Sequence, residues 1–244
     1  MFQKLFLLAI LSLFLASCQF TESLVLNEDG SGTISVEVNL NEMMAFGAMG
    51  GDSVVTKMDT IIYMKQFLEE KKDSIATLPK GEQMKLKKLE NFNIHLKINT
   101  EASEMEYDIA TTFKSIEEVD DLMNALNQAG NFVPGMDQNQ KKDEPDSPDI
   151  IGVRYSFDKG VFKRDAYIKD KTRHQKEVDS LKQSEAFLGG VFYTLSYKFP
   201  RPIKKVSDPE ATLSNDKKGL TLKKSFIDYF KNPDLLDLEV ELEK

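Results

Sequence analysis

Apolar and polar side chains alternate in several stretches of this chain. In residues 33–40 every second side chain is apolar, and the side chains between them are polar or charged. The same two-residue period recurs in residues 92–99, 104–113, 151–157 and 191–199. Successive side chains of a strand point to opposite faces, so each stretch is predicted to be a strand. Strands with one apolar and one polar face are typical of an antiparallel sheet with one side in water.

A polar, glycine-containing segment, residues 27–32, separates a predicted strand at 23–26 from the strand at 33–40. Such a segment between two strands predicts a β-hairpin. Its oxygen-bearing side chains also have the spacing of an EF-hand calcium loop, but that loop needs a bidentate Glu at its twelfth position. The chain has Val38 there. The hairpin is therefore the preferred interpretation, and no metal site is predicted.

Other segments have helical periodicity. Apolar side chains recur every three or four residues in the segments 52–68, 82–90, 115–130 and 169–188. Ser115 and Glu118 form a capping box at the start of the third segment. This segment directly follows a predicted strand, and an apolar sheet face needs a cover. We therefore expect it to cover the sheet, with Leu122 in the core.

Together these segments predict an α+β fold. We expect an antiparallel sheet of about nine or ten strands in hairpins, with about four helices packed on one face. Residues 137–149 contain no apolar side chain and include Pro145 and Pro148. Such a segment is expected to be a mobile acidic loop. We expect residues 23–244 to form a single domain that contains this loop.

Residues 1–18 have the layout of a secretory signal. Lys4 supplies a positive charge, residues 5–15 are apolar apart from Ser12, and small residues precede Cys18. The apolar run is about eleven residues long, whereas a membrane-spanning helix needs about 20. A transmembrane anchor is therefore disfavoured. An ordinary signal peptide would leave Cys18 as a free thiol in an oxidising compartment, which is also disfavoured.

The end of this signal, Leu15, Ala16, Ser17 and Cys18, resembles the bacterial lipobox, in which a lipid is attached to the cysteine thiol and the chain is cut just before it. The resemblance implies lipidation of Cys18, with palmitate among the acyl chains.

The lipobox also predicts how the chain is divided and where it is located. Residues 1–17 are expected to be a cleaved lipoprotein signal peptide, and residues 18–22 a lipidated tether. Gln19 follows the cysteine, whereas Asp at this position would resemble an inner-membrane retention signal. We therefore expect an outer-membrane protein of the cell envelope that faces the periplasm.

Composition excludes some classes of partner. The net charge is −8 and no basic cluster is present, which disfavours nucleic acid. Without a polybasic patch for anionic headgroups, membrane attachment must depend on the lipid at Cys18.

Catalytic motifs are missing from the sequence as well: it has no nucleophile elbow, zinc-protease motif, P-loop or dinucleotide fingerprint. His95 and His174 are predicted to be solvated. Two separated histidines cannot build a typical zinc site, and acylation of Cys18 would leave no thiolate ligand. We expect no enzymatic activity, no cofactor and no metal. A pair of carboxylates acting as a hydrolase stays open as the remaining alternative.

Two stretches resemble known lipoproteins. Residues 24–33, from Leu24-Val25-Leu26-Asn27 to Gly30-Ser31-Gly32-Thr33, resemble the first hairpin of uncharacterised Bacteroidota lipoproteins. The C-terminal part, from Tyr197-Lys198-Phe199-Pro200 to Leu238, is similar to the end of LppM-type lipoproteins. The second resemblance implies an α+β lipid-binding domain and assigns no binding residue in this chain.

These observations predict a membrane-anchored lipoprotein of the cell envelope that acts as a non-catalytic binding or structural module. The first candidate ligand is a lipid or another apolar molecule. The alternative is a protein–protein interaction or assembly factor of the envelope. A deep apolar pocket would favour the first interpretation, and a flat apolar patch would favour the second.

Overall fold

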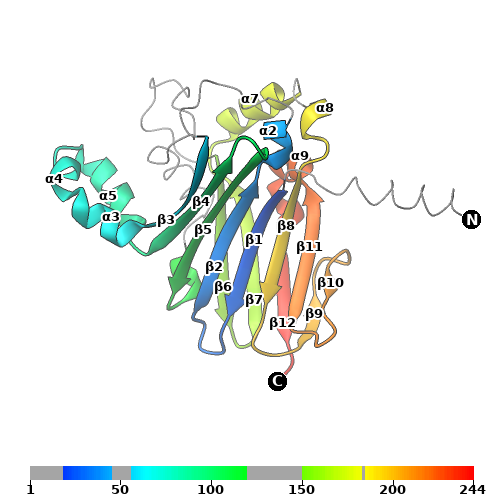
Figure 1. Ribbon diagram of the computed structural model, residues 1–244. Helices are drawn as coiled ribbons and strands as arrows, with labels where there is room; N and C mark the ends of the chain where they lie inside the picture. The colour runs from blue at the N-terminus through cyan, green and yellow to red at the C-terminus, as the bar shows by residue number, and fades with distance from the viewer. Residues whose placement is uncertain (1–18, 46–55, 120–149, 183–184) are drawn as a thin grey trace, which may run out of the picture.

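Two β-sheets face each other in the computed structural model, which describes residues 19–45, 56–119, 150–182 and 185–244 (Figure 1). The larger sheet has eight strands in the order β10-β11-β8-β1-β2-β5-β4-β3. These strands are β1 (Gln19–Leu26), β2 (Gly32–Asn39), β3 (Lys57–Tyr63), β4 (Phe92–Asn99), β5 (Glu104–Phe113), β8 (Phe192–Lys198), β10 (Thr212–Leu213) and β11 (Gly219–Ser225). The smaller sheet has four strands in the order β6-β7-β12-β9. They are β6 (Ile151–Asp158), β7 (Val161–Ile168), β9 (Ile203–Val206) and β12 (Leu238–Leu242).

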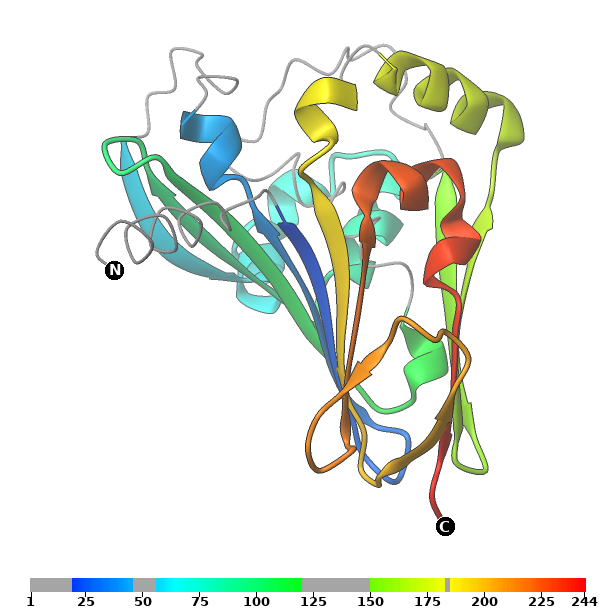
Figure 2. The ribbon, with the colours of Figure 1, turned by 90° about the vertical axis from the view of Figure 1, so that its right-hand side faces the viewer.

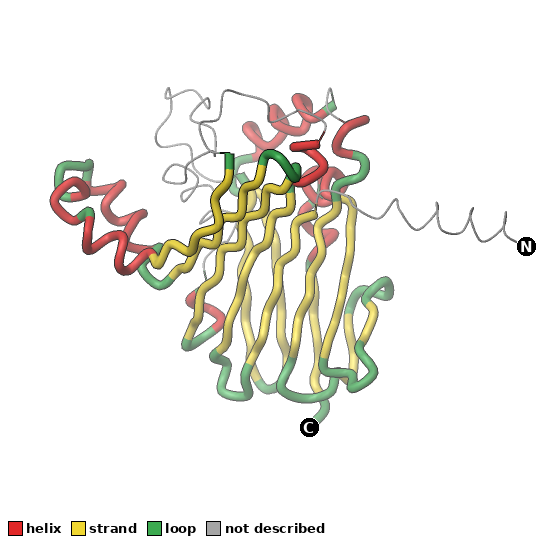
Figure 3. The backbone as a smooth tube through the Cα atoms, in the orientation of Figure 1, coloured by secondary structure: helices red, strands yellow, loops and turns green. Residues whose placement is uncertain are grey.

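The helices are short and lie around the strands (Figure 3). The α-helices are α2 (Asn41–Ala45), α3 (Met64–Glu70), α4 (Lys72–Ile75), α5 (Lys80–Lys88), α7 (Lys171–Leu181), α8 (Glu185–Leu188) and α9 (Phe226–Lys231), and the 3₁₀ helices are η1 (Ile116–Glu118) and η2 (Pro233–Leu236). Helices α3, α4 and α5 form an excursion beyond β3, whereas α2, α7, α8 and α9 lie at one end of the sheets (Figures 1 and 2). Within the described residues, no helix is long and apolar enough to cross a membrane.

The core lies between the two sheets. Their inner faces contribute to one cluster of buried apolar side chains. Phe162 of β7 packs edge-on against Tyr197 of β8 and Phe199, with ring centroids 5.6 and 5.4 Å apart. Figure 2 shows the sheets close together at the end with the β1–β2 and β6–β7 turns and further apart at the end with α2, α7, α8 and α9.

The α+β class is confirmed, but the predicted arrangement of the sheet was wrong. The described residues form twelve strands in two sheets instead of about nine or ten in one. In the described residues, the second sheet covers the apolar face of the larger sheet at β1 and β8, where helices had been expected. The physical reason is that β6, β7 and β12 also have an apolar face, and two such faces bury each other when the sheets pack.

The antiparallel prediction also fails at one position. β1 pairs antiparallel with β2 but parallel with β8, with Gln19 opposite Phe192. A parallel pair requires a long crossover connection, and here the chain between these two strands spans most of the molecule. Alternation within a strand gives no information about such a distant partner.

The predicted hairpins are confirmed. The turn between β1 and β2 has Gly30 at φ 82°, and the amide of Asn27 donates a hydrogen bond to the carbonyl of Ser31 at 2.8 Å. A positive φ is readily adopted by glycine, which has no Cβ to clash. β4 and β5 also pair directly with each other, as do β6 and β7.

The helix predicted at 52–68 was wrong over much of its length. Lys57–Tyr63 is strand β3, which pairs antiparallel with β4, and only the following Met64–Glu70 is helical. The run Thr60-Ile61-Ile62 is β-branched and favours a strand, and pairing with β4 supplies its backbone hydrogen bonds.

Two further predicted segments differ or lie outside the described residues. Residues 19–22, which we expected in the tether, belong to β1. Of the helix predicted at 115–130, the described part forms the 3₁₀ turn Ile116–Glu118. The Ser115 hydroxyl donates to the Glu117 carboxylate and does not cap this turn. Leu122 and the loop at 137–149 lie outside the described residues.

The sandwich predicts different costs for substitutions on its two faces. Leu195 of β8 is 0% exposed and faces the core. Leu195→Ala should lower the free energy of unfolding by about 2–5 kcal/mol because it removes buried methyl groups and leaves a cavity. Its exposed neighbour Ser196 is the matched control, and Ser196→Ala should change stability by about 0.5 kcal/mol or less. Urea denaturation measures both, and equal losses would mean that both faces of β8 are buried.

Candidate functional site

A carboxylate lies in the core between the two sheets. Glu22 is on the inner face of β1 and is 1% exposed. It is surrounded by Arg164 of β7, Tyr155 of β6, and Tyr193 and Tyr197 of β8. Both sheets therefore contribute to this cluster, which we call the interior charge network.

Every oxygen of the Glu22 carboxylate is occupied. Arg164 donates from Nη2 to Oε2 at 3.1 Å and from Nε to Oε1 at 3.3 Å, a bidentate pair. The hydroxyl of Tyr155 donates to Oε1 at 2.8 Å, that of Tyr193 donates to Oε2 at 2.7 Å, and Tyr197 also donates to Oε1. The remaining Nη1 of Arg164 donates to the carbonyl of Leu236 at 3.1 Å.

The network stays ionised because its members compensate one another. Burial by itself would raise the pKa of Glu22, but the Arg164 guanidinium and the hydroxyls of Tyr197 and Tyr193 outweigh it and hold that pKa below its ordinary value. Burial, together with the negative charge of Glu22, raises the pKa of Tyr155, Tyr193 and Tyr197 well above their ordinary value. The tyrosines are therefore hydrogen-bond donors at neutral pH.

This arrangement favours a structural role over a chemical one. The side chains of Arg164 and Glu22 are 0% and 2% exposed. A general base or nucleophile needs a free lone pair within reach of a substrate, and Glu22 has neither the lone pair nor the access. The network instead joins β1 and β8 to β6 and β7 across the core.

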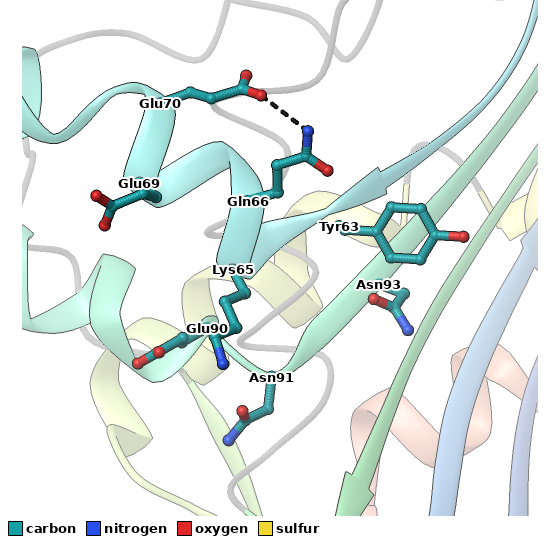
Figure 4. A pocket seen from close by; sticks show the side chains of 8 residues that line it. All are labelled: Tyr63, Lys65, Gln66, Glu69, Glu70, Glu90, Asn91 and Asn93. Carbon is teal, nitrogen blue, oxygen red and sulfur yellow. Dashed lines mark hydrogen bonds between the residues drawn. The ribbon is translucent and has the colours of Figure 1, made fainter.

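A second candidate is an open hollow beside the edge strand β3. It measures about 590 Å³ and is lined by Tyr63, Lys65, Gln66, Glu69, Glu70, Glu90, Asn91 and Asn93. Figure 4 shows the ring of Tyr63 beside Asn93, its partner across the β3–β4 pair, with Lys65, Gln66, Glu69 and Glu70 on α3. Gln66 donates to Glu70 at 2.9 Å. The hollow offers one aromatic face among hydrogen-bonding groups, a combination suited to binding.

The strand next to this hollow exposes apolar side chains. Ile61 and Tyr63 are 51% and 53% exposed and lie on the outer face of β3. β3 is the last strand of the larger sheet as described, and only β4 pairs with it there. An edge strand with apolar side chains is a template for another strand. We call the pair Ile61 and Tyr63 the edge patch.

Carboxylates also gather on the outer face of the larger sheet, where Glu37 of β2 is directly opposite Asp108 of β5. Partial burial and the nearby charges of Asp108 and Glu106 raise the pKa of Glu37, and partial burial raises that of Asp108. These residues line neither the hollow at β3 nor a second one around residues 163–165 and 207–209. The acid pair of a hydrolase needs a cleft between its carboxyls for the substrate, so this face does not favour hydrolysis.

The two histidines have different environments. His95 is on the outer face of β4, as predicted, and its Nε2 lies 2.8 Å from a carboxylate oxygen of Asp59. The prediction that His174 is solvated was wrong: it is 6% exposed, and its Nε2 lies 2.7 Å from the carbonyl of Phe230. The physical reason is that α7 packs on α9, which places this face of α7 inside. Among the described residues, no group of three or more acidic, His or Cys side chains could hold a metal ion.

The predicted lipidation residue, Cys18, and the lipobox residues Leu15, Ala16 and Ser17 lie outside the described residues. Sequence reasoning missed the interior charge network altogether, although a signal for it exists. Glu22 and Arg164 fall at positions in phase with the apolar side chains of their own strands. A charge at such a position indicates either a mispredicted strand or a buried partner.

No protein-family model, curated protein or solved structure matches this chain.

The interior charge network predicts strong coupling between its two charges. Glu22→Gln and Arg164→Met should each lower the free energy of unfolding by about 3–5 kcal/mol, because each leaves the other charge buried without its partner. The double variant buries no unpaired charge and should be more stable than either single variant. Chemical denaturation of the four proteins measures this cycle, and strictly additive losses would contradict it.

Acid titration of the same proteins is an independent check. A lowered pKa means that Glu22 stabilises the fold above its ordinary pKa of 4.5. This contribution is lost as the pH falls through the lowered value in the folded state. The wild type should therefore lose stability below about pH 4.5 more steeply than the double variant, and equal slopes would show that Glu22 is not ionised in the fold.

Proposed function

We propose that this protein is a lipid-anchored lipoprotein of the cell envelope, attached at Cys18 to the periplasmic face of the outer membrane, whose β-sandwich is a non-catalytic binding or structural module. The observation that carries this proposal is the lipobox-like sequence 15–18 followed without a linker by β1, which starts at Gln19. A cleavage site directly before Cys18 would release the sandwich with the lipid-bearing residue at its edge.

The described chemistry supports a non-catalytic role. The Glu22 and Arg164 charges are sealed in the core and fully paired with each other, with tyrosines and with a backbone carbonyl. The outer carboxylates Glu37 and Asp108 lie on a sheet face and not in a hollow described here. Neither set combines a free reactive group with a place for a substrate.

Protein–protein interaction is the function that the edge patch favours. The space between the sheets is filled with large side chains that are less than 2% exposed, among them Tyr193, Phe162 and Phe199. An apolar ligand inside the sandwich would have to displace them. The edge patch, by contrast, is already exposed beside an open hollow. A segment of an envelope protein that adds to β3 as a strand would gain main-chain hydrogen bonds and contacts with Ile61 and Tyr63.

The anchor is tested by Cys18→Ser in cells that make lipoproteins. The unaltered protein should carry acyl mass on Cys18, partition into detergent and fractionate with the outer membrane. The variant should lose all three properties, because no other described feature holds it to a bilayer. Unmodified Cys18 in intact membranes would end the lipoprotein proposal.

The edge patch is tested by photo-crosslinking in the same cells. A photoreactive side chain at position 63 should give a discrete adduct with a protein, and Ile61→Lys in the same chain should weaken it. Leu213 is the matched control, because it is 40% exposed on β10, the opposite edge of the same sheet. A photoreactive side chain there should give no such adduct. Adducts with lipid alone would support the lipid-binding alternative, and no adduct at position 63 would leave no support for a partner at β3.

A further inference from the structure

The lipid anchor and the sandwich have no flexible residue between them. Gln19 directly follows Cys18 and is already paired on both sides, with Asn39 of β2 and Phe192 of β8. Consecutive Cα atoms are about 3.8 Å apart, so the Cα of Cys18 lies that close to a residue of the sheet. The start of β1 cannot move away from Cys18 without breaking strand pairing.

The bilayer sets the other limit. The headgroup region is roughly 5–7 Å thick on each side of the hydrocarbon core. A lipid on the Cys18 thiol has its acyl chains in that core, and the cysteine side chain is only a few bonds long. Gln19 is therefore held close to the headgroups.

From these constraints we infer that one end of the sandwich is a membrane-facing surface. We define this anchor end by Gln19, Asn39, Phe192 and Ser225, the strand termini that the pairing of β1, β2, β8 and β11 brings together. The partner is the lipid bilayer that holds the anchor. This inference rests on the proposed lipidation of Cys18 and adds the orientation of the domain.

The side chains beside Gln19 suit a headgroup layer. Phe192 is its neighbour across the parallel pair, and the ammonium group of the exposed Lys223 lies 3.9 Å from the centre of the Phe192 ring. A ring with a cation over it offers an apolar surface to the acyl boundary and a positive charge to phosphate. Helices α2, α7, α8 and α9 lie at the same end, beyond the start of β1, and therefore share this surface with the strand termini (Figures 1 and 2).

The opposite end points away from the membrane. It carries the turns at 27–31 and 158–160. These turns are close together: a Cβ added to Gly30 would lie 3.9 Å from the ring of Phe157. At the same end, Nε of Arg201 donates a hydrogen bond to the Glu28 carboxylate in the turn at 27–31, over 3.0 Å. β1 spans eight residues, or about 26 Å, so this turn end is clear of the headgroups when the strands stand on the bilayer.

The same orientation places the edge patch above the membrane. Cross-strand register runs from Tyr63 through Asn93, Ala110 and Ser35 to Ser23. Ser23 is four residues along β1 from Gln19, about 13 Å. Tyr63 is therefore the part of the edge patch that lies beyond the headgroups and is open to a partner in the periplasm.

The experiment uses the full lipidated chain in vesicles of phosphatidylethanolamine and phosphatidylglycerol that contain a headgroup nitroxide lipid. Single introduced cysteines carry a fluorophore and report the distance of each position from the headgroups. The label reacts only with them, since the Cys18 thiol carries the lipid. Gly190→Cys is at the anchor end, where an added Cβ meets nothing within 4 Å. Ser196→Cys lies further along β8, and Asp158→Cys is at the turn end.

Quenching by the nitroxide should be several-fold stronger at position 190 than at 196, and at background at 158. A flexible Gly-Ser linker of about 20 residues between Cys18 and Gln19 is the matched control, because its reach of roughly 25 Å should remove the difference between positions. Equal quenching at 190 and 158 without the linker, or stronger quenching at 158, would overturn the inference.

The mass of the anchor distinguishes this failure from that of the proposed function. Protein with acylated Cys18 and equal quenching at both ends would refute the orientation alone. Protein whose Cys18 carries no acyl mass would refute the proposed function, and the orientation with it.

Discussion

The ion pair between Glu22 and Arg164 holds the two sheets in one arrangement. Taking two charges out of water costs several kcal/mol each, and a well-packed apolar pair would often be as stable. What an apolar pair lacks is direction: the bidentate contact and the three tyrosine donors are satisfied only when β1, β6, β7 and β8 have one relative position. The network therefore specifies how the sheets are placed, and the apolar core around it supplies the stabilisation.

β1 is the strand on which this arrangement depends. Its hairpin with β2 is local, but its parallel pairing with β8 joins Gln19 to Phe192, which the chain reaches only after β7 and α7. Contacts of such sequence separation are slow to form, because the intervening chain must first be ordered. The strand nearest the proposed lipid anchor thus becomes fixed only when the C-terminal half folds, and it ends up in the interior of the sheet.

Period-two patterns predicted most strands because each strand has one buried face, and this signal is local. The same pattern gives no partner, so the second sheet and the parallel β1–β8 pair could not be predicted. In residues 57–63 the period is obscured because Ile61 and Tyr63 are apolar yet exposed, and the run was mistaken for a helix. His174 was mispredicted because its burial depends on α9, far along the chain. Glu22 and Arg164 broke the apolar pattern of their strands, and recognising them as a pair required the packing of the two sheets.

The two exposed surfaces of this protein, the anchor end and the edge patch, lie on different sides of the larger sheet. Under the proposed lipidation of Cys18, no flexible residue separates the anchor from the sheet, so the anchor end would face the bilayer. The edge patch is at the far side of the same sheet, separated from β1 by β2, β5 and β4. Each strand between them is paired with the next, and their inner faces are buried in one core. The two surfaces are therefore fixed relative to each other. A partner on β3 would thus be held at a fixed height above the membrane, which is a geometric property that a flexible tether could not provide.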